Sequence, residues 1–280
     1  MAIERNSAVL LLKMRLDGLE FGRVLMLGNQ NLVLEPAQYR QIMSRLGKTF
    51  SGEMPKYAHE LFLALGAQKV EAMDYSDYQD ADVIQDLNTP IPESLHQQYD
   101  FIFDGGTLEH VFNFPIAIKN CMQMLKPGGR YLGATIPNNW CGHGFYQFSP
   151  ELFYRLFSVE NGFKMVEMYI AELAGQFYQV KDPAEARANV ELCNSKPVFL
   201  LVHARREAIC EVLARPPVQS SYIATWAGKK NVANQRRSIG SLLRKLPVFS
   251  PLFEMRDRRH VKHRTSLLNR RVYTKINIGF

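Results

Sequence analysis

Two histidines near the middle of the chain lie in settings that suit proton transfer. His143 sits between two glycines and precedes an aromatic cluster that includes Tyr146, while His110 directly follows Glu109. Histidine titrates close to neutral pH, so either ring can act as a general base for an acceptor group, with Tyr146 orienting that acceptor. Structural alternatives stay open, because His143 can hold its loop through a backbone carbonyl and His110 can serve only to position its neighbours.

The sequence around both histidines predicts a strand, a glycine turn, a helix, a second glycine turn and another strand. Residues 100–104 form a short apolar run between acids, which is typical of a strand buried on both faces. Apolar residues recur at helical spacing over 114–125, a proline and two glycines end that pattern, and residues 131–136 form the next strand. Ligands of open α/β sheets bind beyond the carboxyl ends of the strands. Residues 104–110 and 137–146 should therefore face one crevice.

The remaining apolar runs complete an α/β chain. Further strands are predicted at 23–28, 69–74, 81–87, 163–173 and 197–205, and helices at 1–20, 39–47, 58–66, 151–157 and 182–194. We therefore expect a Rossmann-like sheet of seven mostly parallel strands with helices on both faces. Residues 48–56 exceed what one crossover needs, and they are expected to be an insertion or a lid.

Asp74 ends the predicted strand at 69–74. Nucleotide-binding folds place a carboxylate at such a position, because it can accept hydrogen bonds from both ribose hydroxyls. The alternative is a solvated carboxylate at a strand end. Asp86 ends the strand at 81–87 in the same way, and there the alternative is a carboxylate that closes its own loop as an Asx-turn.

Two stretches in order, YDFIFDGGTLEHVF and MLKPGGRYLGATIP, resemble the class I S-adenosylmethionine-dependent methyltransferases. The resemblance extends over residues 20–207. It implies a last pair of antiparallel strands, S-adenosylmethionine as the cofactor, and methyl transfer to a small-molecule or glycan acceptor at an oxygen atom. In such a reaction the base is His143 or His110, with Asp104 as a weaker candidate.

The resemblance also assigns a cofactor-binding set. Its turn after the first strand passes the methionine half of the cofactor, and its next strand ends contact the adenosine half. The residues at these positions are Gly28, Asn29, Asp74, Asp86, Leu87, Asp104 and Gly105. This chain departs from the family at the first turn, since Met26 stands where an acid is usual and Asn29, Gln30 and Asn31 replace further glycines.

Two other functions compete with methyl transfer. A methyltransferase-like scaffold without catalysis is favoured by the altered turn at Gly28 and by the basic C-terminal region. A nicotinamide-dependent oxidoreductase would explain the α/β pattern and Asp74, but the chain has no G-x-G-x-x-G after its first strand. Ligand binding separates these three functions. A methyltransferase should bind S-adenosylhomocysteine, a scaffold without catalysis should bind neither cofactor, and an oxidoreductase should bind a nicotinamide.

The net charge of +7 is unevenly distributed. Residues 215–280 carry 15 Lys and Arg against two acids, and the Pro216-Pro217 pair near the start of this basic region marks a boundary. We expect a methyltransferase-like domain over 1–214 and a basic extension over 215–280. A short amphipathic segment at 239–246 suggests an anionic membrane surface or an acidic polymer, while packing on the body or on a second subunit is the alternative. Nucleic acid is disfavoured, because the aromatic residues of the extension are widely spaced.

The four cysteines occur without the spacing of a zinc site or of a disulfide framework. No apolar run approaches the roughly 20 residues of a membrane-spanning helix. We therefore expect no metal and a cytoplasmic protein that the extension can hold at a membrane surface. No feature of the sequence indicates an oligomeric state.

Overall fold

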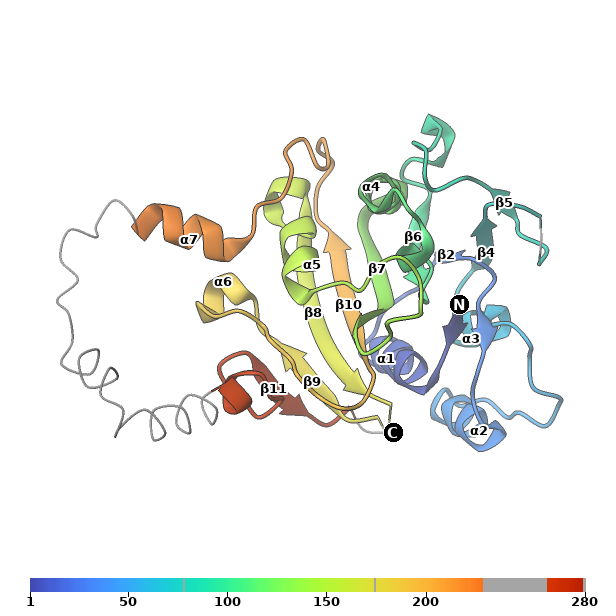
Figure 1. Ribbon diagram of the computed structural model, residues 1–280. Helices are drawn as coiled ribbons and strands as arrows, with labels where there is room; N and C mark the ends of the chain where they lie inside the picture. Colours follow the sequence, from blue (N-terminus) through green and yellow to red (C-terminus); the bar gives the residue numbers. More distant parts are fainter. Residues whose placement is uncertain (78, 174, 229–260, 279–280) are drawn as a thin grey trace.

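The computed structural model describes residues 1–77, 79–173, 175–228 and 261–278 and shows one large sheet with helices on both faces (Figure 1). The strands of this sheet are β2 (Arg23–Leu27), β4 (Lys69–Asp74), β5 (Val83–Ile84), β6 (Tyr99–Asp104), β7 (Leu125–Asn138), β8 (Phe163–Glu172), β9 (Phe177–Val180), β10 (Val198–Arg206) and β11 (Tyr273–Ile276). A small parallel sheet joins β1 (Ala2–Ile3) to β3 (Asn31–Leu32).

The helices in the described ranges are α1 (Arg5–Leu16), α2 (Pro36–Arg45), α3 (His59–Ala64), α4 (Phe114–Met124), α5 (Pro150–Leu156), α6 (Pro183–Ala186) and α7 (Ser220–Gly228). Short 3-10 turns occur at η1 (Glu93–Leu95), η2 (Leu108–His110) and η3 (Val159–Asn161). The helix expected over 182–194 is thus limited to α6. Its C-cap, Arg187, has a left-handed backbone with φ of 49°, which ends the helix after one turn.

The order of the large sheet is β11-β9-β8-β10-β7-β6-β2-β4-β5. The five strands from β7 to β5 are parallel, and β10 is antiparallel to both β7 and β8. The predicted Rossmann-like fold is confirmed. The sheet is mixed and not mostly parallel, because its four parallel pairings from β7 to β5 are matched by four antiparallel pairings from β7 to β11. The predicted strand number of seven was wrong, because the described residues form nine strands in this sheet.

The two additional strands extend one edge of the sheet. β9 folds back on β8 through a tight turn in which Gly175 has φ of +87° and the Glu172 amide donates to the Gln176 carbonyl at 2.9 Å. β11 then pairs with β9 in an antiparallel register that aligns Tyr273 with Val180. Both strands are four residues long, which leaves too few apolar positions for a periodic pattern in the sequence.

The sheet is buried on both faces, and β2 illustrates how its side chains alternate. Leu25 and Leu27 pack with α4 and α5 in one apolar core, whereas Val24 and Met26 pack with α1, α2 and α3 in the other. Alternation of this kind follows from the two-residue period of a strand. The helix predicted over 1–20 is α1, and its apolar side chains are buried on a face of the central strands.

The end of the basic extension belongs to the sheet. Tyr273 is 1% exposed and its hydroxyl donates to the Glu191 carbonyl at 3.0 Å, and the neighbouring Val272 is fully buried. The expected boundary at residue 214 therefore does not separate β11 from the body. The segment expected to be amphipathic, 239–246, lies outside the described residues. In the described ranges, none of the helices has the length and apolar character to cross a membrane.

Candidate active site

A cavity of about 500 Å³ lies where β2, β4 and β5 end and the chain leaves β6. Its lining residues are Met1, Gly28, Met73, Asp74, Tyr75, Gln85, Asp86, Leu87, Asn88, Thr107, His110 and Val111. The fold thus brings together four of the seven predicted cofactor-binding residues, Gly28, Asp74, Asp86 and Leu87, and one predicted base, His110. No residue of the segment at 48–56, the expected insertion or lid, lines this cavity.

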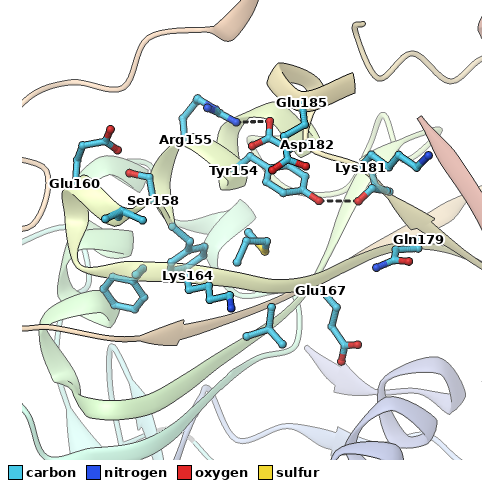
Figure 2. Close-up of a pocket in the computed structure, with 16 residues that line it drawn as sticks. Tyr154, Arg155, Ser158, Glu160, Lys164, Glu167, Gln179, Lys181, Asp182 and Glu185 are labelled. Atoms are coloured by element: carbon cyan, nitrogen blue, oxygen red, sulfur yellow. Dashed lines mark hydrogen bonds and ion pairs between the residues drawn. The ribbon is translucent and has the colours of Figure 1, made fainter. Parts of the chain in front are cut away.

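A larger cleft of about 700 Å³ lies between α5, η3, β8 and β9 (Figure 2). Many of its polar groups already bond one another: Arg155 pairs with Asp182, and the Tyr154 hydroxyl donates to the Val180 carbonyl at 2.6 Å. None of the predicted site residues lines it. Because ligand sites of this class of sheet lie at the carboxyl ends of the strands, the smaller cavity is the candidate active site.

The turn after β2 retains the one glycine that its geometry requires. Gly28 has φ of +75°, and its amide donates to the Met73 carbonyl on β4 at 2.6 Å. A Cβ atom at this position would lie 2.6 Å from both Sδ and Cε of Met1. The Met1 side chain therefore occupies the space directly over Gly28, and the Thr107 hydroxyl donates to its Sδ at 2.8 Å.

Gln30 replaces one of the glycines that the family resemblance implied. Its side chain is fully buried, its amide nitrogen donates to the Leu27 carbonyl, and its Oε1 faces Gly105. Gln30 does not line the cavity. The substitution therefore fills the space beneath the turn and leaves the cavity side of Gly28 unchanged.

The acids at the ends of β4 and after β5 both reach the cavity. Asp74 accepts a hydrogen bond from the Tyr75 amide at 2.7 Å. Asp86 accepts from the Asn88 amide at 2.8 Å and from the Asn88 side chain at 2.9 Å through the same oxygen, Oδ1. Asp86 therefore closes its own loop as an Asx-turn and also lines the cavity. The Asx-turn and a place in the ligand cavity are thus compatible for this residue.

Asp104, Asn29 and Gly105 lie outside the cavity lining. Asp104 is buried, and its carboxylate accepts from the Thr107 amide at 2.8 Å and from the Tyr131 hydroxyl at 2.9 Å. Burial raises the pKa of Asp104. These contacts hold the turn that carries η2. The Asn29 side chain donates to the Gln79 carbonyl at 2.9 Å.

His110 and His143 meet edge to face, with ring centroids 4.9 Å apart. His110 lines the cavity, and burial together with the neighbouring His143 lowers its pKa. His143 does not line the cavity, and 42% of its side chain is exposed. Within the described residues, no backbone carbonyl accepts a hydrogen bond from the His143 ring. The alternative that His143 only holds its loop through a backbone carbonyl therefore has no hydrogen bond to support it.

Glu109 is buried directly beneath the histidines. Its side chain is 1% exposed, its Oε2 accepts from the Thr135 hydroxyl at 3.1 Å, and its Oε1 lies 3.9 Å from Nε2 of His143. Burial, and then the nearby Asp104, raise the pKa of Glu109 to about 8. In the sequence, Glu109 stands only as part of the motif YDFIFDGGTLEHVF. An acid next to one candidate base was the signal that it could have a role of its own.

Tyr146 contributes to a wall of aromatic rings instead of pointing a free hydroxyl at the cavity. Its ring stacks on Phe148 at 5.7 Å, and its hydroxyl donates to the Phe112 carbonyl at 2.6 Å. Seven residues that line the cavity were not predicted: Met1, Met73, Tyr75, Gln85, Asn88, Thr107 and Val111. Of these, Tyr75 directly follows Asp74, and Asn88 directly follows Leu87. Their positions after the strand ends could therefore have predicted them as lining residues.

No protein-family model matches the sequence, and no curated protein matches it. Solved structures that match include the 1,6-didemethyltoxoflavin-N1-methyltransferase of Burkholderia thailandensis with bound S-adenosylhomocysteine, at 14% identity and a TM-score of 0.44 over 73% of this chain and 78% of that one.

Two further matches extend the comparison. The trans-methyltransferase CalH in complex with S-adenosylhomocysteine is 12% identical over 72% of this chain and 57% of its own, with a TM-score of 0.39. The branched-chain polyamine synthase of Thermus thermophilus, bound to 5′-methylthioadenosine, is 12% identical over 78% and 61%, with a TM-score of 0.38. The strand order makes the fold Rossmann-like, and two of these three similar structures are methyltransferases with bound S-adenosylhomocysteine.

Proposed function

We propose that this protein transfers a methyl group from S-adenosylmethionine to a small-molecule acceptor. One observation carries the proposal. Gly28, Asp74 and Asp86, which are far apart in the sequence and were singled out for three different parts of one cofactor, line a single cavity at the carboxyl ends of the strands. That cavity opens beside His110, so a binding site and a candidate base are adjacent.

The residues of the cavity fit the cofactor by chemistry and by size. A volume of about 500 Å³ lies within the range usual for small-ligand pockets. Asp74 would accept hydrogen bonds from the ribose hydroxyls, Asp86 and the backbone of Leu87 would contact the adenine, and Gly28 would allow close approach of the methionine half. When bound, the cofactor supplies a methyl group on a sulfonium. The Met1 side chain would have to move away from Gly28 for the methionine half to enter.

On the acceptor side, we assign His143 as the base and His110 as its neighbour at the cavity. An acceptor hydroxyl or amine must lose a proton, and His143 is exposed enough to pass that proton to water. The aromatic wall that includes Tyr146 suits an organic or glycan acceptor with an apolar face. We place the methyl group at an acceptor oxygen, as the family resemblance implied.

Calorimetry with S-adenosylhomocysteine tests this function, with a nicotinamide dinucleotide as the comparison ligand. The proposal requires that S-adenosylhomocysteine bind and that the dinucleotide not compete. Binding of neither ligand would favour the scaffold without catalysis. Binding of the dinucleotide alone would favour the oxidoreductase.

A separate observation favours a second property, peripheral binding of a cytoplasmic protein to an anionic membrane. The helix α7 presents Tyr222, Ile223 and Trp226 to solvent, with exposed fractions of 56%, 51% and 57%. Tryptophan and tyrosine are the residues that anchor proteins at a membrane interface, and residues 215–280 carry a net charge of +13. A helix of nine residues is marginal in water on its own, so a surface that covers it would stabilise it.

A further inference from the structure

The contact between Glu109 and His143 lies outside the roles assigned so far. Glu109 Oε1 points toward Nε2 of His143 across 3.9 Å, and its other oxygen is held by the Thr135 hydroxyl. A buried carboxylate that is fixed on one side and faces a histidine on the other has the arrangement of an acid that orients a catalytic base. The distance is about 1 Å longer than a hydrogen bond, as is common in sites without bound substrate.

The backbone of Glu109 also holds the loop that carries His143. The amides of Phe145 and Tyr146 both donate to the Glu109 carbonyl, at 2.8 and 3.2 Å. Gly144 packs so tightly here that a Cβ atom would lie 2.8 Å from the same oxygen, and its φ is +73°. Glu109 thus faces His143 through its side chain and holds the loop of His143 through its backbone carbonyl. These two contacts fix the position of one residue relative to the other.

We propose that Glu109 is the positioning residue of a Glu109–His143 pair, in which its carboxylate accepts the Nε2 proton of His143 and thereby leaves Nδ1 free to take the acceptor's proton. This inference rests on the proposed function. The acceptor loses its proton to Nδ1, the imidazole becomes an imidazolium, and the negative charge of Glu109 compensates it. The proton then leaves to water from the exposed side of the ring.

The groups around Glu109 determine when the pair can form. Asp104 on β6 opposes ionisation of Glu109, whereas the amino group of Met1 favours it. His143 on its loop faces Oε1 of Glu109 and adjoins His110 on η2, which lines the cavity, and the Thr135 hydroxyl on β7 stabilises the carboxylate. Since burial is the largest influence, Glu109 is neutral at acidic pH and ionises as pH rises through about 8. The orienting form of the pair therefore appears with rising pH.

The experiment is an NMR titration of the histidine rings in the full chain, which requires no acceptor. We expect the His143 ring signals to show an inflection near pH 8 that reports ionisation of Glu109. Glu109→Gln should remove this inflection. Glu167→Gln is the matched control, because Glu167 faces His203 at 3.2 Å in a separate Glu–His contact and should alter only His203.

Further readouts separate this inference from the proposed function and from simple misfolding. The carboxyl carbon signal of Glu109 in the unsubstituted protein should titrate near pH 8, which requires no variant. Glu109→Gln should bind S-adenosylhomocysteine with the affinity of the parent, so a parent that fails to bind contradicts the proposed function and leaves the pair intact. A His143 titration that lacks the inflection in the parent, or keeps it in Glu109→Gln, overturns the pair.

Discussion

The thioether of Met1 covers Gly28 so closely that a Cβ atom at Gly28 would lie 2.6 Å from the Met1 Sδ. This space is where the methionine half of the cofactor is expected, and 42% of Met1 is exposed. If the proposed function holds, the Met1 side chain fills the place of the cofactor's methionine half. Binding should carry the cost of moving it.

The first prediction is that a protein whose chain starts at Ala2 binds S-adenosylhomocysteine about fivefold more tightly. Displacing a half-exposed methionine side chain should cost about 1 kcal/mol, which is equivalent to that factor. Calorimetry of the two proteins measures it. Ala2 keeps its hydrogen bond to the Gly105 carbonyl, so equal thermal stability is the control. Weaker binding after removal would show that Met1 contacts the ligand instead of excluding it.

The second prediction concerns the carboxylate at the end of β4. Asp74→Ala should weaken binding of S-adenosylhomocysteine by roughly ten- to hundredfold, because a charge-assisted pair of hydrogen bonds contributes about 1.5 to 3 kcal/mol. Asp77→Ala is the control, since Asp77 is an exposed acid nearby that does not line the cavity. Equal affinities for both variants would contradict the ribose site at Asp74.

Much of this fold could be predicted because each central strand is a continuous apolar run followed by a polar or glycine residue. The rule that ligands bind beyond the carboxyl ends then placed Gly28, Asp74 and Asp86 near one another without any knowledge of side-chain contacts. The strands β9 and β11 could not be found in this way. Their four residues pair with partners that only the folded edge of the sheet supplies.

The parts of the site that sequence could not predict depend on long-range contacts. The position of Met1 follows from the two-residue pairing of β1 with β3, which has no pattern of its own. The approach of His143 to His110 depends on a loop held by the Glu109 carbonyl. A side chain's neighbours across such contacts are set by tertiary packing, so the carboxylate beneath His143 emerged only from the structure.

The third prediction is that Glu109 makes stability depend on pH. The folded state raises the pKa of this carboxyl from its ordinary value of 4.5 to about 8, so the folded protein holds the proton more tightly than the unfolded chain. This stabilisation is complete below pH about 4.5 and is lost as pH rises toward 8. Glu109→Gln should remove a slope of at most about 1.4 kcal/mol per pH unit in this window, measured by denaturant unfolding at several pH values.

The pH dependence has an internal check. Asp104 ionises in the same buried environment, so part of the slope should survive in Glu109→Gln. A variant whose stability falls with pH as steeply as that of the parent would mean that Glu109 is ionised in the fold at neutral pH.

The fourth prediction tests whether the end of the basic extension is part of the body. Tyr273→Ala should lower the free energy of unfolding by about 3 to 5 kcal/mol, the usual cost of removing a buried aromatic ring. Lys275→Ala, an exposed position on the same strand, should change it by less than about 0.5 kcal/mol. Truncation after Pro217 should be destabilising for the same reason, because it removes β11 and uncovers β9. A small effect of Tyr273→Ala would mean that β11 is not part of the body and that the domain boundary lies before it.

The last prediction concerns the exposed aromatic side of α7. The chain has two tryptophans, so in a Trp140→Phe background the fluorescence reports Trp226 alone. Vesicles that contain anionic lipid should shift its emission to shorter wavelength, while neutral vesicles should not, and added salt should reverse the shift because the basic residues supply the attraction.

Trp226→Ala should weaken vesicle binding about tenfold in sedimentation, whereas Val159→Ala, which removes an exposed apolar side chain elsewhere, should not. If a soluble quencher fails to reach Trp226 in the protein without vesicles, another part of the chain or a second copy covers this helix, and the membrane proposal is wrong.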